Sequence, residues 1–459
     1  MVNIKNSELP ISLKDRKVCV MGLGFVGLTL AVTLADIGYD VYGVELREDV
    51  VKLLKKGMPH FFEPGLEGRL KSLIKTKKLK IFRKIHKHFD TSVYIVTVGT
   101  PIKENDKVNK EMMKRVCKEI STFTKNNDLV ILRSTVEVGT TKKMTKMFFN
   151  NKKIKIGVAF CPERTIEGNA MIELRKLPQI VGSEEMEVTS RVSQFFSFMT
   201  PTVVKVSNSE TAELIKLIDN CQRDVSFALS NEIAEIADIY SVSAYEVINS
   251  GKLGYPRTNL PDPGPVGGPC LEKDSYILSN GLDQSNYFPK IIMNSRQVNE
   301  QQPKRTISLL KKYYDTISNG KVKFQITIAG IAFKGKPETN DLRGTMALPI
   351  IKEIKKNFPN CVIKIFDPIV KKDEAKDYFK KFRFNFTNSI ENSFKNCSLY
   401  IICNNHSIFG SMPITVLSQL MKSPSVIFDF WNNYTNQRIS LPSSVRYIGL
   451  GNLGKALSS

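Results

Sequence analysis

The sequence predicts an α/β fold: two doubly wound parallel-sheet domains joined by a long central helix and a further helical region. Three observations indicate this. Short apolar strand patterns alternate with helical patterns up to about residue 205, the alternation returns after residue 318, and the stretch between them has helical periodicity without a strand pattern. We therefore expect domains over residues 1–205, 206–317 and 318–459. With 459 residues, of which 42% are hydrophobic, the chain is long enough for two or three domains with substantial cores.

The first domain is expected to begin with a strand, a glycine-rich turn and a helix. The stretch KVCVMG predicts a strand over 17–22, and GLTLAVTLADIG predicts a helix over 27–38 that ends at a glycine. Residues 18–35 are uncharged, but glycines interrupt them and their first part is short and β-branched, so we do not interpret them as a membrane span. Further strands are expected over residues 40–45, 92–98, 128–135 and 155–160.

The middle of the chain is expected to be helical. From residue 210 to about 250 there is no proline, and apolar side chains such as Leu214, Leu217 and Cys221 recur at helical spacing. A loop rich in Gly and Pro follows, GYPRTNLPDPGPVGGPC, which ends at Cys270. Strand patterns then return, and the strands of the last domain are expected over residues 324–333, 361–368, 398–405 and 425–431.

The chain carries a formal net charge of +22, from 67 Lys and Arg residues against 45 Asp and Glu residues. A nucleic-acid-binding protein concentrates such charge on one element with interleaved aromatic side chains, whereas an enzyme for phosphorylated substrates places a few basic residues in clefts. Here the lysines are spread along the whole chain, so we interpret most of them as solvated and expect no nucleic-acid partner. The densest basic run, residues 70–89, is expected to be an exposed helix end and loop.

None of the eight cysteines forms a CxxC pair, and the four histidines complete no metal-ligand spacing, so we expect no metal site. Dispersed cysteines without a recognisable secretory signal indicate a reducing cytoplasm. Cys270 stands out because it lies behind Gly267 and Gly268, with Lys273 close after it. Glycines let a substrate approach the backbone closely, and a nearby lysine favours the thiolate. The segment is therefore either a reactive site or a turn that happens to contain a cysteine.

The turn GLGFVG matches the G-x-G-x-x-G pattern of a Rossmann-like dinucleotide site, because it ends an expected strand and opens an expected helix. Gly22 permits the tight turn, Gly24 lets a pyrophosphate approach the backbone, and Gly27 lets helix and strand pack closely. The phosphates would then meet the N–H groups and the dipole of the helix N-terminus. Glu45 ends the next strand and can accept both ribose hydroxyls, which favours NAD, although Arg47 leaves NADP open.

Polar residues follow two more of the expected strands. Thr100 and Thr135 lie after strand ends, and in an open parallel sheet these ends line the ligand crevice, so both are candidates for contact with cofactor or substrate. Either threonine can instead cap a helix. In CPERTIEGNA, Glu163 and Arg164 have the simpler interpretation of an ion-paired surface loop.

Two further groups of residues have both a structural and a functional interpretation. Lys216, Asn220 and Arg223 form a stripe on the expected long helix, which is either a solvated face or, if Lys216 and Asn220 are buried, a place to hold an oxyanion. Lys334 and Arg343 lie in GIAFKGKPETNDLRG, a second glycine-containing turn after a strand. They suit phosphate recognition, or they belong to a solvated loop.

Eight motifs in this order resemble the UDP-sugar 6-dehydrogenases, the family of UDP-glucose and UDP-N-acetylmannosamine dehydrogenases. They are GLGFVG, EPGL, TVGTP, STVEVGTT, CPERTIEG, AELIKLIDNCQRD, PGPVGGPCLEKD and the pair GIAFK and NDLR, and the resemblance spans residues 18–451. Each motif is weak alone, but the ordered set is highly specific. The resemblance implies an NAD-binding domain, a central helical dimerisation domain with the catalytic cysteine loop, and a C-terminal UDP-binding domain.

The resemblance also implies a reaction and its residues. The family oxidises the C6 alcohol of a UDP-sugar to a carboxylate with two NAD per turnover, through a thiohemiacetal and a thioester on a cysteine that corresponds to Cys270. The other implied catalytic residues are Lys216 and Asn220 at the oxyanions, Asp274 as base or water-orienting group, Glu163 in thioester hydrolysis, and Thr135 near the reacting carbon. Contacts with NAD are implied for Gly22, Gly24, Phe25, Val26, Gly27, Glu45, Thr100 and Thr135. Contacts with the UDP-sugar are implied for Arg164, Thr165, Lys216, Asn220, Arg223, Tyr255, Arg257, Gly267, Phe333, Lys334 and Arg343.

The sequence leaves alternatives for the substrate. The PER and QRD segments resemble the N-acetylhexosamine branch of the family, with UDP-N-acetylmannosamine or UDP-N-acetylglucosamine as substrate in cell-surface polysaccharide biosynthesis, whereas Glu167 before Gly168 resembles the UDP-glucose branch. A two-electron β-hydroxyacid dehydrogenase, which needs no cysteine, is a further alternative, as is a basic scaffold protein without turnover. We expect a cytoplasmic homodimer with no membrane partner.

Overall fold

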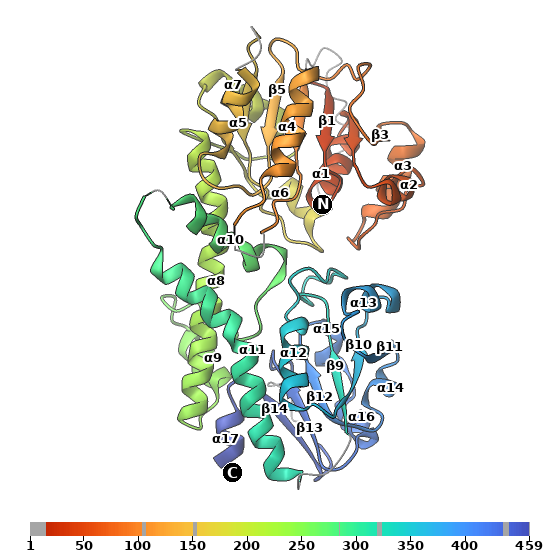
Figure 1. Ribbon diagram of the computed structural model, residues 1–459, viewed down its shortest axis with the longest axis vertical. Coiled ribbons are helices and arrows are strands. Elements are labelled where there is room, and N and C mark those ends of the chain that lie inside the picture. Colours follow the sequence, from red (N-terminus) through yellow and green to blue (C-terminus); the bar gives the residue numbers. More distant parts are fainter. Residues whose placement is uncertain are drawn as a thin grey trace. The chain divides into compact units, whose positions relative to one another are not determined.

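The computed structural model describes residues 15–102, 107–149, 154–283, 285–318, 324–434 and 440–458. The chain forms two compact units, Met1–Asp219 with Tyr276–Phe288, and Asn220–Ser275 with Pro289–Ser459. Each unit contains one large, mostly parallel β-sheet with helices on both faces (Figure 1). The predicted fold class is therefore confirmed.

The sheet of the first unit has eight strands in the order β3-β2-β1-β4-β5-β6-β7-β8. The neighbouring strands are parallel, except that β6 and β7 meet antiparallel at Phe160 and Gly182. The first six strands have the order of a Rossmann fold, whose ligand crevice lies where the order reverses, between β1 and β4. The strands are β1 (Lys17–Met21), β2 (Asp40–Val44), β3 (Leu79–Phe82), β4 (Val93–Val96), β5 (Leu129–Leu132), β6 (Gly157–Phe160), β7 (Gln179–Gly182) and β8 (Val203–Val206).

Both faces of this sheet are buried, because successive side chains of a strand point to opposite faces and both sets are apolar. Val18 and Val20 of β1 pack on one face, and Cys19 and Met21 pack on the other. The first face is covered by α1 (Phe25–Asp36), α2 (Glu48–Lys55), α3 (Leu66–Lys75), α6 (Ala170–Lys176) and α7 (Met186–Ser197). The second face is covered by α4 (Glu111–Phe123) and α5 (Thr140–Phe149).

The sheet of the second unit is wholly parallel and repeats the same order of strands, β11-β10-β9-β12-β13-β14. A second switch point therefore lies between β9 and β12. The strands are β9 (Gln325–Ala329), β10 (Val362–Phe366), β11 (Phe384–Thr387), β12 (Cys397–Ile402), β13 (Ser425–Asp429) and β14 (Val445–Gly449).

Helices cover both faces of the second sheet as well. Ile326 and Ile328 of β9 pack against α11 (Lys290–Ile317) and α12 (Ala347–Asn357), together with α17 (Leu453–Ser458). The opposite face is covered by α14 (Ile390–Phe394), α15 (Ser407–Ser411) and α16 (Ile414–Leu417). The short helix α13 (Lys372–Tyr378) lies between β10 and β11 in the chain.

The expected long helix is present, but it is shorter than predicted. Helix α8 (Ser209–Ile239) ends before Ser241, which has a left-handed φ of 56°, and α9 (Ala244–Lys252) follows with the Ser243 hydroxyl accepting the N–H of Glu246 as its cap. Helix α10 (Gly268–Gly281) then begins inside the segment that was expected to be a loop. None of the helices in the described ranges is both long enough and apolar enough to cross a bilayer.

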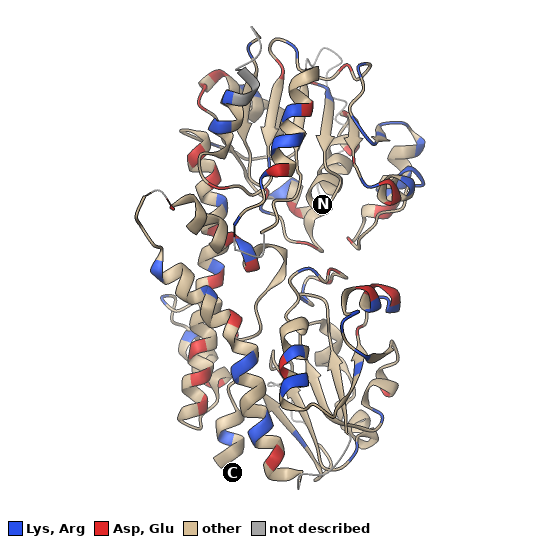
Figure 2. Ribbon diagram, viewed as in Figure 1, with Lys and Arg blue, Asp and Glu red and all other residues tan. Residues whose placement is uncertain are grey.

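The strands and the first helix expected from the sequence are all present, with ends that differ by a few residues. The prediction for residues 70–89 is wrong in part, because β3 lies within this run. Its alternation of buried Leu79 and Ile81 with exposed Lys80 is typical of a strand with one solvated face. Strands β7, β8, β11 and β14 were not expected. Lys and Arg residues are spread over the elements of both units and mixed with Asp and Glu (Figure 2).

Candidate active site

The turn after β1 has the backbone geometry that its glycines predict. Gly22 has a left-handed φ of 91°, and a Cβ on Gly27 would lie 1.8 Å from the Gly22 carbonyl oxygen. A Cβ on Gly24, in contrast, would meet nothing within 4 Å. Gly22 and Gly27 are thus required by the turn and by helix packing, whereas Gly24 leaves open space at the surface where a pyrophosphate would approach.

The N-terminus of α1 is suited to an anion. Gly24 caps the helix without a side-chain hydrogen bond, and the first turn contains no acidic residue, so the N–H groups of this turn remain available. Phe25 and Val26, the first residues of α1, are half-buried, and the Phe25 ring packs against Phe61 with centroids 5.1 Å apart. These residues fit the diphosphate of a dinucleotide.

Glu45 lies directly after β2 and is held by backbone N–H groups. Its Oε2 accepts a hydrogen bond from Leu23 at 3.0 Å, and its Oε1 accepts one from Arg47 at 3.0 Å. Each carboxylate oxygen has a second lone pair, so Glu45 can still accept ribose hydroxyls. The Arg47 side chain turns to Asp49, with Nη2 2.7 Å from Oδ2. Arg47 is therefore engaged elsewhere rather than presented to a 2′-phosphate.

Two of the predicted threonines lie together at the strand ends. The Thr100 hydroxyl is buried and donates to the backbone carbonyl of Thr135 at 2.6 Å. Thr135 itself is half-buried. The Thr97 hydroxyl bonds in the same way to the carbonyl of Gly22, at 2.8 Å. Thr100 thus fixes the segment that carries Thr135, and both threonines follow strands, as the sequence predicted.

Glu163 is not in a solvated surface loop but buried, and the simpler sequence interpretation is wrong. Its Oε2 lies 2.5 Å from Nη2 of Arg133, and its Oε1 accepts the backbone N–H groups of Arg164 and Thr165 at 2.8 and 2.9 Å. Burial raises the pKa of Glu163, but the Arg133 guanidinium, these N–H groups and Lys216 together hold it below the usual value. Glu163 is therefore an oriented carboxylate, whose charge is set by its surroundings.

Arg133 is completely buried at the end of β5. Its Nη1 donates to Oε1 of Gln179 at 2.9 Å, and its guanidinium lies over the Phe196 ring, 5.3 Å from the centroid. Of the predicted substrate residues in this unit, Thr165 and Lys216 are half-buried. Arg164 is also half-buried and donates to the Pro178 carbonyl at 2.8 Å, with Asp219 3.6 Å away.

Cys270 lies in the first turn of α10 rather than in a loop. It is exposed, whereas the other seven cysteines are buried. Burial raises the pKa of the buried thiols where a shift is resolved, to about 12 for Cys117, Cys161 and Cys221. Cys270 is therefore the accessible thiol of the eight, and it lies at a helix N-terminus, where the helix dipole is positive.

The glycines before Cys270 are needed for close packing within the protein. A Cβ on Gly267 would lie 2.3 Å from the Gly344 carbonyl oxygen, and the Gly268 N–H donates to that same oxygen at 2.7 Å. A Cβ on Gly268 would lie 2.4 Å from the Phe333 ring. The start of α10 is therefore in contact with the segment that carries Phe333, and the expectation that a substrate approaches these glycines stays a prediction.

Asp274 and Asn220 form a buried pair one turn after Cys270. Asn220 Nδ2 donates to Asp274 Oδ2 at 2.5 Å, and Lys273 Nζ lies 4.0 Å from Oδ1. The stripe on α8 is therefore not uniformly solvated. Asn220 is buried, Lys216 is half-buried and only Arg223 is exposed. The condition for an oxyanion site, that Lys216 and Asn220 are both buried, is thus met by Asn220 and only in part by Lys216.

The segment around Cys270 is clamped by Arg296 of α11, which sequence reasoning missed. Arg296 is buried and donates to the carbonyls of Val266 and Leu271 at 3.1 Å each, on both sides of the cysteine. Its charge is balanced by Asp224 of α8 at 2.8 Å. Asn299, one turn after Arg296, donates to the same carboxylate at 2.8 Å. These contacts fix the backbone of the turn that presents Cys270.

The remaining predicted substrate residues of the second unit are more exposed. Arg343 pairs with both oxygens of Asp341, with Nη2 2.5 Å from Oδ2. Lys334 Nζ lies over the Phe333 ring, 5.3 Å from its centroid. Arg257 packs on Tyr255, with the guanidinium 4.6 Å from the ring centroid and Nε donating to the hydroxyl at 3.1 Å. Phe333, Lys334 and Arg343 follow β9 at the second switch point.

Each unit thus assembles its own part of the predicted set. The first brings together the glycine turn, Glu45, the Thr100–Thr135 contact and Glu163. The second contains the Asn220–Asp274 pair, Cys270 one turn before Asp274 in α10, and Gly268 against Phe333. Arg133 and Arg296 were missed, although each is a lone arginine within an apolar or amphipathic run, which is a signal for a buried, paired charge.

Comparison with known proteins finds similarity along most of the chain. Models of the UDP-glucose/GDP-mannose dehydrogenase family match in three parts: the NAD binding domain over residues 16–200, the central domain over 210–301 and the UDP binding domain over 327–436. UDP-N-acetyl-D-mannosamine dehydrogenases of Pyrococcus horikoshii and Methanococcus aeolicus are 31% and 30% identical. The alignments cover 77% and 91% of this chain, and 84% and 91% of those relatives. The solved structure of the UDP-D-ManNAc dehydrogenase from P. horikoshii superposes with a TM-score of 0.84 at 28% identity, over 96% of this chain and 100% of that chain.

Proposed function

Because the chain belongs to the UDP-glucose/GDP-mannose dehydrogenase family, we propose that it oxidises C6 of a UDP-N-acetylhexosamine, first of all UDP-N-acetylmannosamine, to the uronate. The protein is an NAD-dependent oxidoreductase of the UDP-sugar dehydrogenase class. The choice of sugar is supported by relatives that act, by their names, on UDP-N-acetyl-D-mannosamine. The uronate would serve as a building block of cell-surface polysaccharide.

The observation that carries the proposed chemistry is the setting of Cys270. It is the one exposed cysteine of eight, it lies in the first turn of α10, and Arg296 holds the backbone on both sides of it. A structural cysteine is usually buried and inert, whereas a nucleophilic one needs access and an environment that favours the thiolate. A two-electron dehydrogenase has no use for such a residue.

The proposed reaction passes through two covalent species on Cys270. Bound NAD supplies the hydride acceptor, one molecule for each of two oxidations. In the first oxidation C6 loses a hydride and its hydroxyl loses a proton, which gives an aldehyde. The Cys270 thiolate adds to the aldehyde carbon and, after protonation of the oxygen, forms a thiohemiacetal. Loss of a second hydride and of the hydroxyl proton gives a thioester. Water then adds, the C–S bond breaks, and the carboxylate and the thiolate are released.

The surrounding residues have distinct proposed roles. Asn220 and Lys216 stabilise the oxyanions that form at the C6 oxygen, and Asp274, which is held by Asn220, accepts or orients protons. Glu163 orients the water that hydrolyses the thioester. Because its pKa is lowered, the Glu163 carboxylate is a weak base, so it is better suited to orienting the water than to removing a proton from it. Thr135 is the hydroxyl proposed to lie near the reacting carbon.

The two switch points supply the proposed binding residues. The α1 N-terminus would bind the diphosphate of NAD, and Glu45 would bind its ribose. The proposed NAD residues are Gly22, Gly24, Phe25, Val26, Gly27, Glu45 and Thr100. The UDP moiety would be bound by Phe333, Lys334 and Arg343 after β9, with Gly267 beside them and Tyr255, Arg257, Arg223, Arg164 and Thr165 contributing further contacts. Arg343 would exchange Asp341 for a phosphate.

A substrate panel tests this proposal. UDP-N-acetylmannosamine, UDP-N-acetylglucosamine, UDP-glucose and UDP-galactose are supplied in turn with NAD, and NADH is measured against product. We expect the highest kcat/KM for UDP-N-acetylmannosamine and two NADH per uronate. Preference for UDP-glucose would refute the sugar assignment, and one NADH per product would refute the cysteine mechanism in favour of a two-electron dehydrogenase.

Cys270→Ser tests the nucleophile separately. We expect turnover to fall by orders of magnitude, while the affinity for NAD stays nearly unchanged because the NAD residues lie elsewhere in the chain. Cys221→Ser is the matched control, since that thiol is buried and its pKa is raised to about 12. A Cys270→Ala variant with full activity would contradict the mechanism.

The protein is proposed to act as a homodimer in the cytoplasm. Leu229, Ile236 and Tyr240 repeat on one face of α8 and its end, and all three are exposed, as is Ile239. No disulfide links any of the eight cysteines, which fits a reducing compartment. Sedimentation should show a dimer that Ile236→Glu with Ile239→Glu converts to monomers, and a monomeric parent protein would rule the dimer out.

A further inference from the structure

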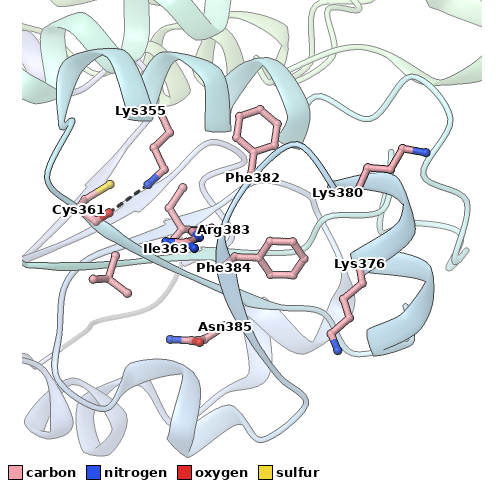
Figure 3. A pocket seen from close by; sticks show the side chains of 10 residues that line it. Lys355, Cys361, Ile363, Lys376, Lys380, Phe382, Arg383, Phe384 and Asn385 are labelled. Atoms are coloured by element: carbon pink, nitrogen blue, oxygen red, sulfur yellow. Dashed lines mark hydrogen bonds between the residues drawn. The ribbon is translucent and has the colours of Figure 1, made fainter.

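A cavity of about 640 Å³ lies at the edge of the second unit's sheet (Figure 3). Its walls come from the first residues of β10 and of the edge strand β11, the end of α12, the end of α13 and the segment that follows α13. Lys355 and Cys361 lie on one side of the Phe384 ring, and Lys376 and Lys380 lie on the other (Figure 3). The volume is within the range of small-molecule sites, about 300–1,000 Å³.

This cavity is separate from the proposed UDP site. The strands of the sheet are parallel, and the cavity is lined by Ile363 and Phe384, near the amino ends of β10 and β11. Phe333, Lys334 and Arg343, in contrast, follow the carboxyl end of β9. The two sites are therefore at opposite ends of the same strands, and nothing proposed for the dehydrogenase reaction uses the cavity.

The cavity concentrates positive charge without a counter-charge. Lys355, Lys376, Lys380 and Arg383 line it, and none of its lining residues is acidic. None of these four cations forms an ion pair with any residue in the described ranges. Some other basic residues of the same unit are paired, for example Arg305 with Glu235 at 2.6 Å. Unpaired cations around a concave surface raise the local concentration of anions.

Neither helix dipoles nor a lysine-rich composition accounts for the whole cluster. Lys355 and Lys376 lie in the last turns of α12 and α13, where the dipole favours cations, but Lys380 and Arg383 lie beyond these helices. The exposed Asp373 and Asp377 of α13 do not line the cavity. Four cations from three segments of chain therefore line one cavity whose lining contains no acidic residue.

The apolar part of the wall indicates what else the ligand contains. Phe382 and Phe384 are half-buried. The Phe384 ring lies between Lys355 on one side and Lys376 and Lys380 on the other (Figure 3). We infer that this cavity binds a small molecule with at least two phosphate charges and a flat ring, which is the chemistry of a nucleoside polyphosphate. The cations would take the phosphates, and the phenylalanines would take the ring.

Calorimetric titration of the intact protein tests this inference. Saturating NADH and UDP first fill the proposed cofactor and substrate sites, and ATP is then added as the probe. We expect one further site per chain, and the triple variant Lys376→Gln, Lys380→Gln, Arg383→Gln should weaken ATP binding by at least about tenfold. Lys352→Gln, Lys372→Gln, Lys422→Gln removes the same charge from exposed positions of the same unit and should change binding less than about twofold.

A further variant tests the contact with the ring separately from the contact with the phosphates, and enzyme activity is measured independently of ATP binding. Phe384→Leu should weaken binding of ATP but not of inorganic tripolyphosphate, and equal loss for both would refute the ring contact. No additional site in the parent protein, or equal weakening in the two triple variants, would overturn the inference. NADH production from the UDP-sugar should be the same in all these variants, so a failure of the proposed dehydrogenase function is seen independently.

Discussion

Arg133 and Glu163 form a buried ion pair in which Nη2 of the arginine lies 2.5 Å from Oε2 of the carboxylate. Neither group can be left alone at this depth, because an unpaired buried charge is strongly unfavourable. The arginine therefore does more than neutralise. It sets the direction in which Glu163 presents its carboxylate, and it sets the pH range in which that carboxylate is charged.

Arg133→Met should shift the acid limb of the pH–rate profile upward. Without the guanidinium, burial is the largest influence left on Glu163, and burial raises its pKa. In the parent protein the lowered pKa keeps Glu163 ionised at neutral pH. The contribution of ionised Glu163 to the free energy of unfolding is fully present above the ordinary glutamate pKa of about 4.3. It is lost as the pH falls through the lowered pKa of Glu163 in the folded protein. We expect the midpoint of the acid limb of kcat to rise by at least about one unit.

Arg133→Lys is the control for this prediction, because it keeps the charge beside Glu163 while it loses the second N–H group, which bonds to Gln179. Its acid limb should stay close to that of the parent protein even if the melting temperature falls. A purely structural role for Arg133 would lower the stability of both variants and move the acid limb of neither.

Arg296→Met should destabilise the fold and slow the reaction together. The substitution leaves the Asp224 carboxylate buried without its cation, which typically costs about 3–5 kcal/mol. It also frees the carbonyls of Val266 and Leu271 on both sides of Cys270. We expect kcat to fall while the KM for NAD is unchanged, because the NAD residues belong to the other unit. Denaturant unfolding and steady-state kinetics measure the two effects.

Asp224→Asn combined with Arg296→Met separates stability from positioning. The double variant removes both charges, so it should recover part of the stability that the single arginine variant loses. It should not recover kcat, since the two carbonyls still lack their donor. Full activity in either variant would show that the clamp is not needed to present Cys270.

The sequence predicted those parts of the site that depend on local backbone geometry. Gly22, Gly24 and Gly27 could be assigned because a tight turn between strand and helix allows few residues, and their spacing carries that requirement. The same reasoning misplaced Cys270. A proline at position 269 followed by apolar residues at helical spacing is a helix start, so α10 could have been expected from the sequence.

The sequence could not predict contacts between residues far apart in the chain. Arg133 and Glu163 are 30 residues apart, and Arg296 and Asp224 are 72 apart, so nothing in either local pattern shows the partner. For the same reason Glu163 was interpreted as part of a solvated loop. The close contacts of the glycines at 267 and 268 with Gly344 and Phe333 are likewise between residues far apart in the chain.

Gly268→Ala should weaken binding of the UDP-sugar without affecting NAD. Gly268 has a φ of 91°, so a side chain there costs about 1–2 kcal/mol in backbone strain, and its Cβ would push the Phe333 ring away. We expect a higher KM for the UDP-sugar and an unchanged KM for NAD. Gly65→Ala is the control, because its φ is 77° but a Cβ there meets nothing within 4 Å. If both variants raise the KM equally, strain rather than the ring contact is responsible.

Asp49→Ala should increase the use of NADP. In the parent protein Asp49 holds the Arg47 guanidinium, and the side-chain hydrogen bond between them raises the pKa of Arg47. Without Asp49 the arginine is still charged, because the ordinary pKa of a guanidinium is far above neutral pH. Once freed, Arg47 can turn toward a 2′-phosphate. The ratio of kcat/KM for NADP to that for NAD should rise by about two- to fivefold, since exposed ion pairs are weak. Glu45 remains and still disfavours the phosphate, so NAD should stay the preferred cofactor. Lys52→Ala breaks another exposed ion pair of α2, with Glu48 at 3.0 Å, and should leave the ratio unchanged. An unchanged ratio in Asp49→Ala would mean that Arg47 does not reach the ribose.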